Sequence, residues 1–208
     1  MKKIVIASNN VGKLNEIAAI LAPLNIEIVP QSALGVTETD EPHHTFIENA
    51  LVKARHASQH TGLPALADDS GICVEALNGA PGVRSARFAE EVLAISREAQ
   101  DERNNRKLLE LLANESNRKA YYYCVIVLLR GADDPQPLIC EGEWHGEIAQ
   151  TPRGSGGFGY DPLFLILELG KTGAELKPEE KNRISHRGKA LAALLARLSP
   201  TDVSRRRR

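Results

Sequence analysis

A pair of adjacent carboxylates is the clearest candidate for a chemical role in this sequence. Asp68 and Asp69 follow a short apolar run and precede Ser70 and Gly71. Such a pair could hold a divalent metal and a water, because Mg²⁺ takes one or two carboxylates together with waters and phosphate oxygens. Asp, Ser and Gly also favour ordinary turns, so this stretch alone leaves both interpretations open.

A second stretch, Ser-Asn-Asn-Val-Gly-Lys at 8–13, could bind phosphate. We expect it between a strand and a helix, where unpaired N–H groups and the helix dipole attract anions. Side-chain donors from Ser8 to Asn10 and the charge of Lys13 add to this attraction. An ordinary strand-to-helix turn with a solvated lysine fits the same residues. Together with the carboxylates, the stretch indicates chemistry on a phosphate chain.

Two well-known nucleotide-binding motifs do not fit this stretch. A P-loop would need Gly where Ala7 stands and Ser or Thr where Leu14 stands. A dinucleotide-binding Rossmann fold would need spaced glycines after the first strand, and the sequence lacks them. The phosphate chemistry therefore belongs to another class of protein.

Two further regions could contact a ligand. The loop at 154–159 holds four glycines, which is dense enough to indicate a close approach of the backbone to a ligand. Phe158 in this loop offers a flat face to a base, or a side chain to the core. A basic region near the C-terminus could bind an anion or form a solvated face. That region contains Lys181, Arg183, His186 and Arg187.

Strands and helices alternate along the chain and must position these residues. Thr45 and Glu48 form a capping box for a helix that Gly62 closes. A short strand at 63–67 should deliver the aspartate pair at its carboxyl end, with the two side chains on opposite faces. The other predicted strands are 3–7, 26–29, 72–74, 121–129, 138–148 and 163–166, and the other predicted helices are 14–21, 90–99, 107–112 and 190–198.

The order of these elements predicts a mixed α/β fold. Strand–helix–strand units in the first half, followed by a long hairpin of 121–129 with 138–148, favour a mixed sheet over a purely doubly wound one. We find no internal repeat and no long linker. We therefore expect one domain over 1–200, followed by a basic, disordered tail at 201–208.

The composition indicates a cytoplasmic protein with an ordinary core. Of the 208 residues, 42% are hydrophobic, and no run reaches the ~18 apolar residues of a membrane span. The N-terminus shows no signal-peptide pattern. Three cysteines lack metal-type spacing, and we expect them to be reduced core residues. They are Cys73, Cys124 and Cys140.

The net charge of −1 gives no indication of a nucleic-acid partner. The run Arg205–Arg208 is typical of a solvated tail, although a nucleic-acid-binding arm fits it too. That second interpretation leaves the aspartate pair unexplained. We therefore expect neither a membrane nor a stable nucleic-acid partner.

Taken together, these motifs resemble the inosine/xanthosine triphosphate pyrophosphatase family. The resemblance runs from Lys3 to about Leu198. Many relatives have Thr-Gly-Asn where this chain has Ser8-Asn9-Asn10, which keeps the hydroxyl and the asparagine. The motifs that carry the resemblance lie at 8–13, 45–50 with Lys53, 67–71, 79–82, 156–162 and 185–187.

The resemblance implies a homodimer with an elongated mixed α/β fold, in which two lobes surround a central substrate cleft. It also implies Mg²⁺-dependent hydrolysis of dITP, ITP or XTP to the monophosphate and pyrophosphate. Donors from His186 or Arg187 at the 6-keto edge would then favour hypoxanthine and xanthine over adenine. A pyrophosphatase for other modified nucleoside triphosphates and a non-catalytic nucleotide-binding module are the alternatives.

The same resemblance implies roles for individual residues. Asp69 is expected to activate water as general base. Glu41 and Asp69 are expected to bind the metal, with Asp68 as a further candidate. The residues expected to bind substrate are Ser8, Asn9, Asn10, Val11, Gly12, Lys13, Lys53, Ser70, Phe158, Gly159, Tyr160, Asp161, Lys181, His186 and Arg187.

Overall fold

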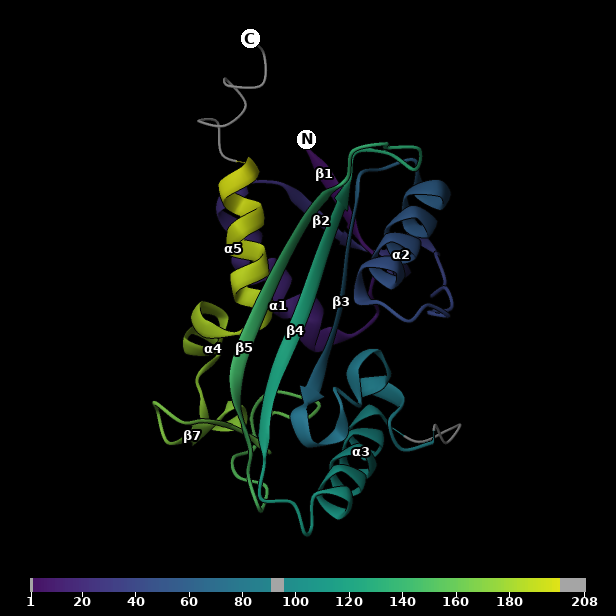
Figure 1. Ribbon diagram of the computed structural model, residues 1–208. Coiled ribbons are helices and arrows are strands. Elements are labelled where there is room, and N and C mark those ends of the chain that lie inside the picture. The colour runs from purple at the N-terminus through teal and green to yellow at the C-terminus, as the bar shows by residue number, and fades with distance from the viewer. Residues whose placement is uncertain (1, 91–95, 199–208) are drawn as a thin grey trace. The chain divides into compact units, whose positions relative to one another are not determined.

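Figure 1 shows a computed structural model that describes residues 2–90 and 96–198. Helices and strands alternate, and short turns of 3-10 helix join several of them. The strands are β1 (Lys3–Ile6), β2 (Glu27–Pro30), β3 (Ala65–Val74), β4 (Lys119–Leu129), β5 (Leu138–Ile148), β6 (Phe164–Ile166) and β7 (Lys171–Thr172). The helices are α1 (Val11–Leu21), α2 (Phe46–Thr61), α3 (Arg97–Leu111), α4 (Pro178–Ile184) and α5 (His186–Leu198).

Within the described residues, the strands form one seven-stranded sheet in the order β2-β1-β3-β4-β5-β6-β7. β1 pairs in parallel with β2 and β3, and Val5 lies opposite Val29 on one side and Ala65 on the other. β6 is antiparallel to both β5 and β7. The predicted mixed α/β class is therefore confirmed. β4 and β5 are neighbours, as expected for the predicted hairpin.

Contacts within the chain divide it into two compact units. Unit one contains the residues up to Asp69, Cys124–Gly142 and the residues from His186 onward. Unit two contains Ser70–Tyr123 and Glu143–Ser185. The central cleft and the single domain over 1–200 stay predictions, and the tail at 201–208 lies outside the described residues.

Unit one has an aliphatic core around the parallel strands. Helix α1 contacts α5, and helix α2 contacts β1 through a face on which Ala50, Ala54 and Ala57 are fully buried. Figure 1 shows α5 and α2 on either side of the strands. The core residues include Ile4, Ile6, Ile17, Leu21, Leu66, Ile126, Leu128, Leu191 and Leu194.

Unit two has a core that includes three packed aromatic rings. The Phe164 ring centroid lies 4.8 Å from that of Tyr122 and 4.9 Å from that of Trp144. Leu108 and Leu112 at the end of α3 belong to the same cluster. Ring pairs at these separations stabilise beyond their buried area. The sheet portion of unit two is therefore anchored to α3 by close packing.

Local capping signals gave the start and end of α2 correctly. The Thr45 hydroxyl accepts from the Glu48 N–H at 3.3 Å and donates to the Glu48 carboxylate at 2.6 Å. Gly62 ends the helix in the left-handed region, with φ of +67°. Glycine adopts that conformation at little cost, so Gly62 stops the helix there.

The predicted strand end at Asp68 and Asp69 was wrong. β3 continues through both aspartates, Ser70 and Gly71 to Val74. Gly71 serves a close approach and not a turn, because a Cβ there would lie 2.2 Å from the Gly82 carbonyl oxygen. The neighbouring Ile72 N–H donates to the Ser85 hydroxyl at 2.9 Å. Turn-forming residue types were therefore overridden by tertiary contacts.

Other differences concern the second half of the chain. Of the helix predicted at 90–99, residues 97–99 are helical as the start of α3, Ser96 caps that helix, and 91–95 lie outside the described residues. The helix predicted at 107–112 is the end of that same α3. α4 and β7 were not predicted because they are short and lack a clear apolar period.

The described residues agree with the expected cysteine chemistry. Cys73, Cys124 and Cys140 are free thiols in strands, and all three are buried. Burial raises the pKa of Cys124 to about 12, so this thiol stays protonated near neutral pH. No helix within the described ranges has the length and apolar character needed to cross a membrane.

Gly71→Ala should destabilise the protein. Its new Cβ would overlap backbone atoms of Gly82, which cannot rotate away as a side chain does. We expect the free energy of unfolding in urea to fall by about 3 kcal/mol, the upper end for overpacking. Gly131→Ala is the matched control, because a Cβ there meets nothing within 4 Å. Equal unfolding midpoints for the two variants would contradict the close approach.

Candidate active site

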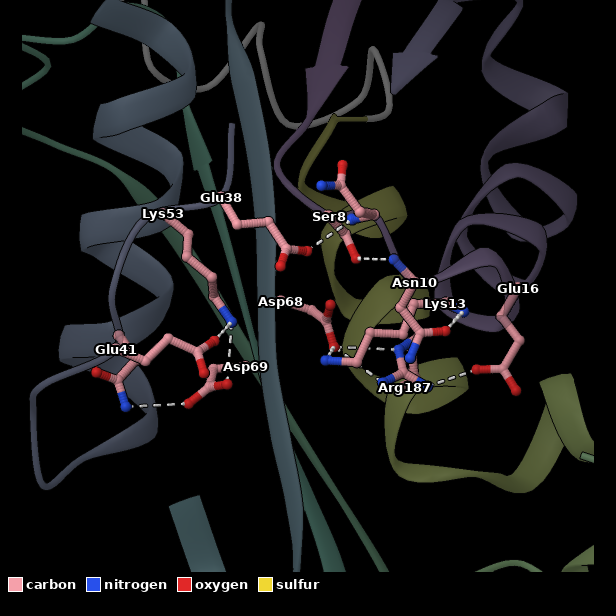
Figure 2. Close-up of polar contacts among 12 residues, drawn as sticks. Ser8, Asn10, Lys13, Glu16, Glu38, Glu41, Lys53, Asp68, Asp69 and Arg187 are labelled. Atoms are coloured by element: carbon pink, nitrogen blue, oxygen red, sulfur yellow. Dashed lines mark hydrogen bonds and ion pairs between the residues drawn. The ribbon is translucent and has the colours of Figure 1, made fainter. Parts of the chain in front are cut away.

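The predicted phosphate loop is held by its own hydrogen bonds (Figure 2). Asn10 caps α1, because its side-chain oxygen accepts from the Lys13 N–H at 3.1 Å. The Ser8 hydroxyl accepts from the Asn10 N–H at 3.2 Å. The N–H groups of Val11 and Gly12 lie in the first helical turn, where a helix supplies no acceptor. They are available to an anion.

Asn9 links this loop to an acidic segment of unit one. Its N–H donates to the Glu38 carboxylate at 3.3 Å, and its side-chain oxygen accepts from Gln31 at 3.5 Å. These bonds place the segment that contains Glu38 and Glu41 beside the predicted phosphate loop. The side-chain oxygen of Asn9 is therefore already used within the protein.

A buried ion-pair network joins Lys13 to the first aspartate. Nζ of Lys13 lies 3.0 Å from Oδ2 of Asp68, which also accepts from Nη2 of Arg187 at 2.8 Å. Asp68 and Arg187 are each 1% exposed. Burial alone would raise the pKa of Asp68, but the charges of Lys13 and Arg187 outweigh it and hold that pKa well below its usual range. Asp68 therefore stays charged and fixes both cations.

Glu16 extends this network from α1. Its carboxylate accepts from Nη1 of Arg187 at 2.5 Å, so the guanidinium contacts two carboxylates. His186 and Arg187 begin α5 and are both buried. The start of α5 approaches β5 closely, because a Cβ at Gly142 would lie 2.2 Å from the His186 carbonyl oxygen. Reading of the base by His186 or Arg187 stays a prediction.

The second aspartate belongs to a different network (Figure 2). Nζ of Lys53 lies 2.6 Å from Oε1 of Glu41 and 3.0 Å from Oδ1 of Asp69. Asn49, one turn earlier on α2, donates to Oδ2 of Asp69 at 3.4 Å. Burial alone would lower the pKa of Lys53, but the charges of Asp69, Glu41 and Asp68 outweigh it and raise that pKa. The ammonium therefore stays protonated between two carboxylates.

The two aspartates differ in their electrostatics. Burial raises the pKa of Asp69, and Lys53 and Lys13 only partly offset this, whereas the pKa of Asp68 is lowered. Consecutive residues of a strand point to opposite faces, which separates the two networks as predicted. Neighbouring carboxylates with opposite shifts can take different roles, and a raised pKa makes Asp69 the stronger base.

Glu41 and Asp69 fit the predicted metal set by their chemistry. Their oxygens already share one cation, the Lys53 ammonium. In the part of the chain that the structure describes, no group of three or more His, Cys, Asp or Glu side chains could hold a metal. Two carboxylates suffice for Mg²⁺ when waters and phosphate oxygens complete its shell. Asp68 instead contacts two cations, which favours a positioning role over its predicted metal role.

Unit two contains the other predicted substrate residues. The Phe158 N–H donates to Oδ2 of Asp161 at 2.9 Å, and Nζ of Lys181 donates to the same oxygen at 2.5 Å. The Lys181 ammonium also lies 4.6 Å from the centroid of the Phe158 ring, which is a cation–π contact. The structure therefore brings Phe158, Asp161 and Lys181 together.

The remaining predicted residues of unit two are Ser70, Gly159 and Tyr160. Tyr160 belongs to the core, and its hydroxyl donates to the Ser85 carbonyl at 2.8 Å. Gly159 has φ of +65°, a conformation that favours glycine. Ser70 is half-buried within β3. Substrate contact by Tyr160 would therefore have to use its backbone.

Sequence reasoning missed four polar residues that contact predicted ones. Helical spacing could have found two of them, since Glu16 lies one turn from Lys13 and Asn49 lies one turn from Lys53. The other two lie on α3 and bond to a residue more than fifty positions away, so no local signal exists for them. The four are Glu16, Asn49, Asp101 and Asn105.

Comparison with known proteins decides the family. The Ham1 family model matches residues 4–197. The chain belongs to the Ham1 family. Two relatives named dITP/XTP pyrophosphatase come from Nitrosomonas europaea and Burkholderia pseudomallei, and they are 68% and 61% identical over 203 and 196 residues. These matches cover 98% and 94% of this chain, and 97% and 93% of the relatives.

The fold of this chain is also similar to that of a solved Ham1 structure. The HAM1 protein from Coxiella burnetii is 50% identical, with a TM-score of 0.85. The match covers 95% of this chain and 98% of that one. The resemblance seen in the sequence motifs is therefore confirmed by family, relatives and fold.

Asp68→Asn should destabilise the protein at neutral pH. The substitution leaves Lys13 and Arg187 without their shared carboxylate, and breaking a buried pair costs about 3–5 kcal/mol. Because the folded protein lowers the pKa of Asp68, this stabilisation is complete above the unfolded pKa of about 4 and is lost as the pH falls further. The difference in free energy of unfolding should therefore shrink below about pH 4.

The matched control for this measurement is Asp133→Asn, at an exposed aspartate. We expect its free energy of unfolding to follow that of the wild-type protein at every pH. A difference between Asp68→Asn and wild type that stayed constant down to pH 2 would contradict the proposed charge pairing.

Proposed function

We propose that this chain hydrolyses dITP, ITP and XTP to the nucleoside monophosphate and pyrophosphate. The proposal rests mainly on the arrangement in unit one. On one strand, Asp68 pairs with Lys13, and Asp69 pairs with Lys53, which also contacts Glu41. A cationic loop beside a carboxylate pair suits hydrolysis of a phosphate chain. Two full-length relatives named dITP/XTP pyrophosphatase support this choice of substrates.

In this proposal the phosphate loop holds the triphosphate. The free N–H groups of Val11 and Gly12 and the ammonium of Lys13 are the donors, while Ser8 and Asn10 fix the shape of the loop. Asp68 and Arg187 keep Lys13 in place. Catalysis of phosphoryl transfer is mainly positioning and electrostatic stabilisation, which is what such a loop supplies.

Glu41 and Asp69 are the proposed ligands of Mg²⁺. Bound there, the ion would offset charge that develops on the phosphate oxygens. Asp69 would take the proton of the attacking water, because burial raises its pKa while Lys53 holds the carboxylate in place. Lys53 would further contact the triphosphate.

Base recognition is assigned first to the Phe158 side chain of unit two. Phe158 offers an aromatic face, and its loop is ordered by Asp161 and Lys181. Ser70, the backbone at 159–160 and His186 are further proposed contacts. Arg187 would act mainly by holding Asp68, because its guanidinium already contacts two carboxylates. A homodimer and a cytoplasmic location complete the proposal.

A substrate panel tests the proposed function. We expect pyrophosphate release from ITP, dITP and XTP at least ~100-fold faster, as kcat/KM, than from ATP, because a site built for a keto acceptor rejects an amino donor. A chelator should abolish all turnover, and Mg²⁺ should restore it. Faster turnover of a modified pyrimidine triphosphate would favour the alternative pyrophosphatase, and binding without turnover would favour the nucleotide-binding module.

Asp69→Asn should lower kcat for ITP by at least ~100-fold, the usual size of a general-base effect. The amide keeps the shape of the side chain but cannot accept the proton. Asp133→Asn is the control for loss of a carboxylate away from the site. Thermal unfolding of both variants checks that they are folded. A folded Asp69→Asn variant with turnover near wild type would exclude Asp69 as the base.

A further inference from the structure

Two side chains of α3 bind the backbone N–H and carbonyl of one residue in the loop at 156–162, which contains Phe158 and is called the Phe158 loop below. Oδ2 of Asp101 accepts from the Gly159 N–H at 2.8 Å, and Nδ2 of Asn105 donates to the Gly159 carbonyl at 2.9 Å. Asp101 and Asn105 are four positions apart, so they share one face of the helix. Both backbone polar groups of Gly159 are therefore fixed by a single rigid element within unit two.

The neighbouring peptide group is fixed by a different carboxylate. The Phe158 N–H donates to Asp161, whose oxygen also accepts from Lys181. Gly157 makes this approach possible, because a Cβ there would lie 2.0 Å from that oxygen. Consecutive N–H groups on the two sides of the Phe158 side chain thus bond to Asp161 and Asp101. The direction of the Phe158 ring depends on both.

The packing of α3 does not require these two side chains. Leu108 is fully buried, and Asn104 bonds to the Ala89 N–H at 2.8 Å and to the Ala86 carbonyl at 3.1 Å. The one ion pair of Asp101 that the structure records, with Arg97 at 3.4 Å, is partly exposed and contributes little. The loop is therefore the main partner of Asp101.

Burial supports the same interpretation. It raises the pKa of Asp101, so the fold bears a cost for keeping this carboxylate beside the loop. A charged acceptor gives a stronger hydrogen bond to an N–H than a neutral one does. Such a bond is worth retaining where the orientation of the loop matters.

We propose that Asp101 and Asn105 are positioning residues that fix the Phe158 ring for stacking on the purine base. The proposal rests on the proposed function, in which the Phe158 loop binds the base. In this proposal neither residue touches the substrate, and neither belongs to the residues around Asp68 and Asp69 that are proposed to carry out hydrolysis. Their loss should therefore weaken binding of the base-bearing substrate and leave the chemical step nearly unchanged.

Kinetics of Asp101→Ala and Asn105→Ala test this proposal. We expect KM for ITP to rise by about 5–20-fold with kcat within about threefold of wild type, since base–aromatic stacking accounts for up to ~100-fold in binding. Asp101→Asn keeps an oxygen acceptor and should restore KM to within about twofold. Glu102→Ala, at an exposed neighbour on α3, is the matched control and should leave KM unchanged.

A ligand that lacks a purine base distinguishes loss of ring positioning from a general structural defect. Inorganic tripolyphosphate should inhibit ITP hydrolysis by occupying the phosphate loop, and its inhibition constant should be the same in wild type and variants. An equal rise in KM and in this constant would overturn the proposal, because the defect would then be structural. Unchanged KM in both folded alanine variants would overturn it too.

Failure of the proposed function gives a different result. A wild-type protein that hydrolysed none of the purine triphosphates would overturn both proposals together. An active wild type with unaffected alanine variants would overturn the positioning role alone. Thermal unfolding of each variant, with melting temperatures within a few degrees of wild type expected, keeps Asn105→Ala informative if Asp101→Ala does not fold.

Discussion

The unit-one site depends on burying two adjacent carboxylates in one strand. A buried charge costs several kcal/mol unless it is paired, so each aspartate of β3 needs its own cation. Asp68 obtains Lys13 from α1 and Arg187 from α5, and Asp69 obtains Lys53 from α2. The alternation of the strand therefore fixes which helix must supply which cation. The placement of three helices around β3 follows from this pairing.

The pairing also gives the two adjacent aspartates different electrostatic environments. Asp68 faces two cations, remains ionised and acts as a fixed anchor. Burial raises the pKa of Asp69, and the Lys53 ammonium, which Asp69 shares with Glu41, only partly offsets this. In the proposed function, these two environments would let the same type of side chain act as a base at Asp69 and as an anchor at Asp68.

The sequence predicted the features that depend on near neighbours. The cap of α2 at Thr45 and the turn into α1 need only residues within one or two helical turns. The cap is confirmed, and the turn exists but is shorter than the predicted 8–13, because α1 begins at Val11. The course of β3 depends on distant partners instead. Arg187, which pairs with Asp68, lies 119 positions away, and the contact of Gly71 with Gly82 requires the folded chain. Local turn propensity could not reveal either.

Charge balance explains why such a site would need a divalent ion. Three cations of unit one, Lys13, Lys53 and Arg187, contact four carboxylates, those of Glu16, Glu41, Asp68 and Asp69. The group is negative before any substrate arrives, and a nucleoside triphosphate brings about four more negative charges. Helix-terminal N–H groups supply only a partial positive charge of about +0.5. In the proposed function, a divalent cation held by Glu41 and Asp69 would add two positive charges to this group, and these two carboxylates already share one cation, the Lys53 ammonium.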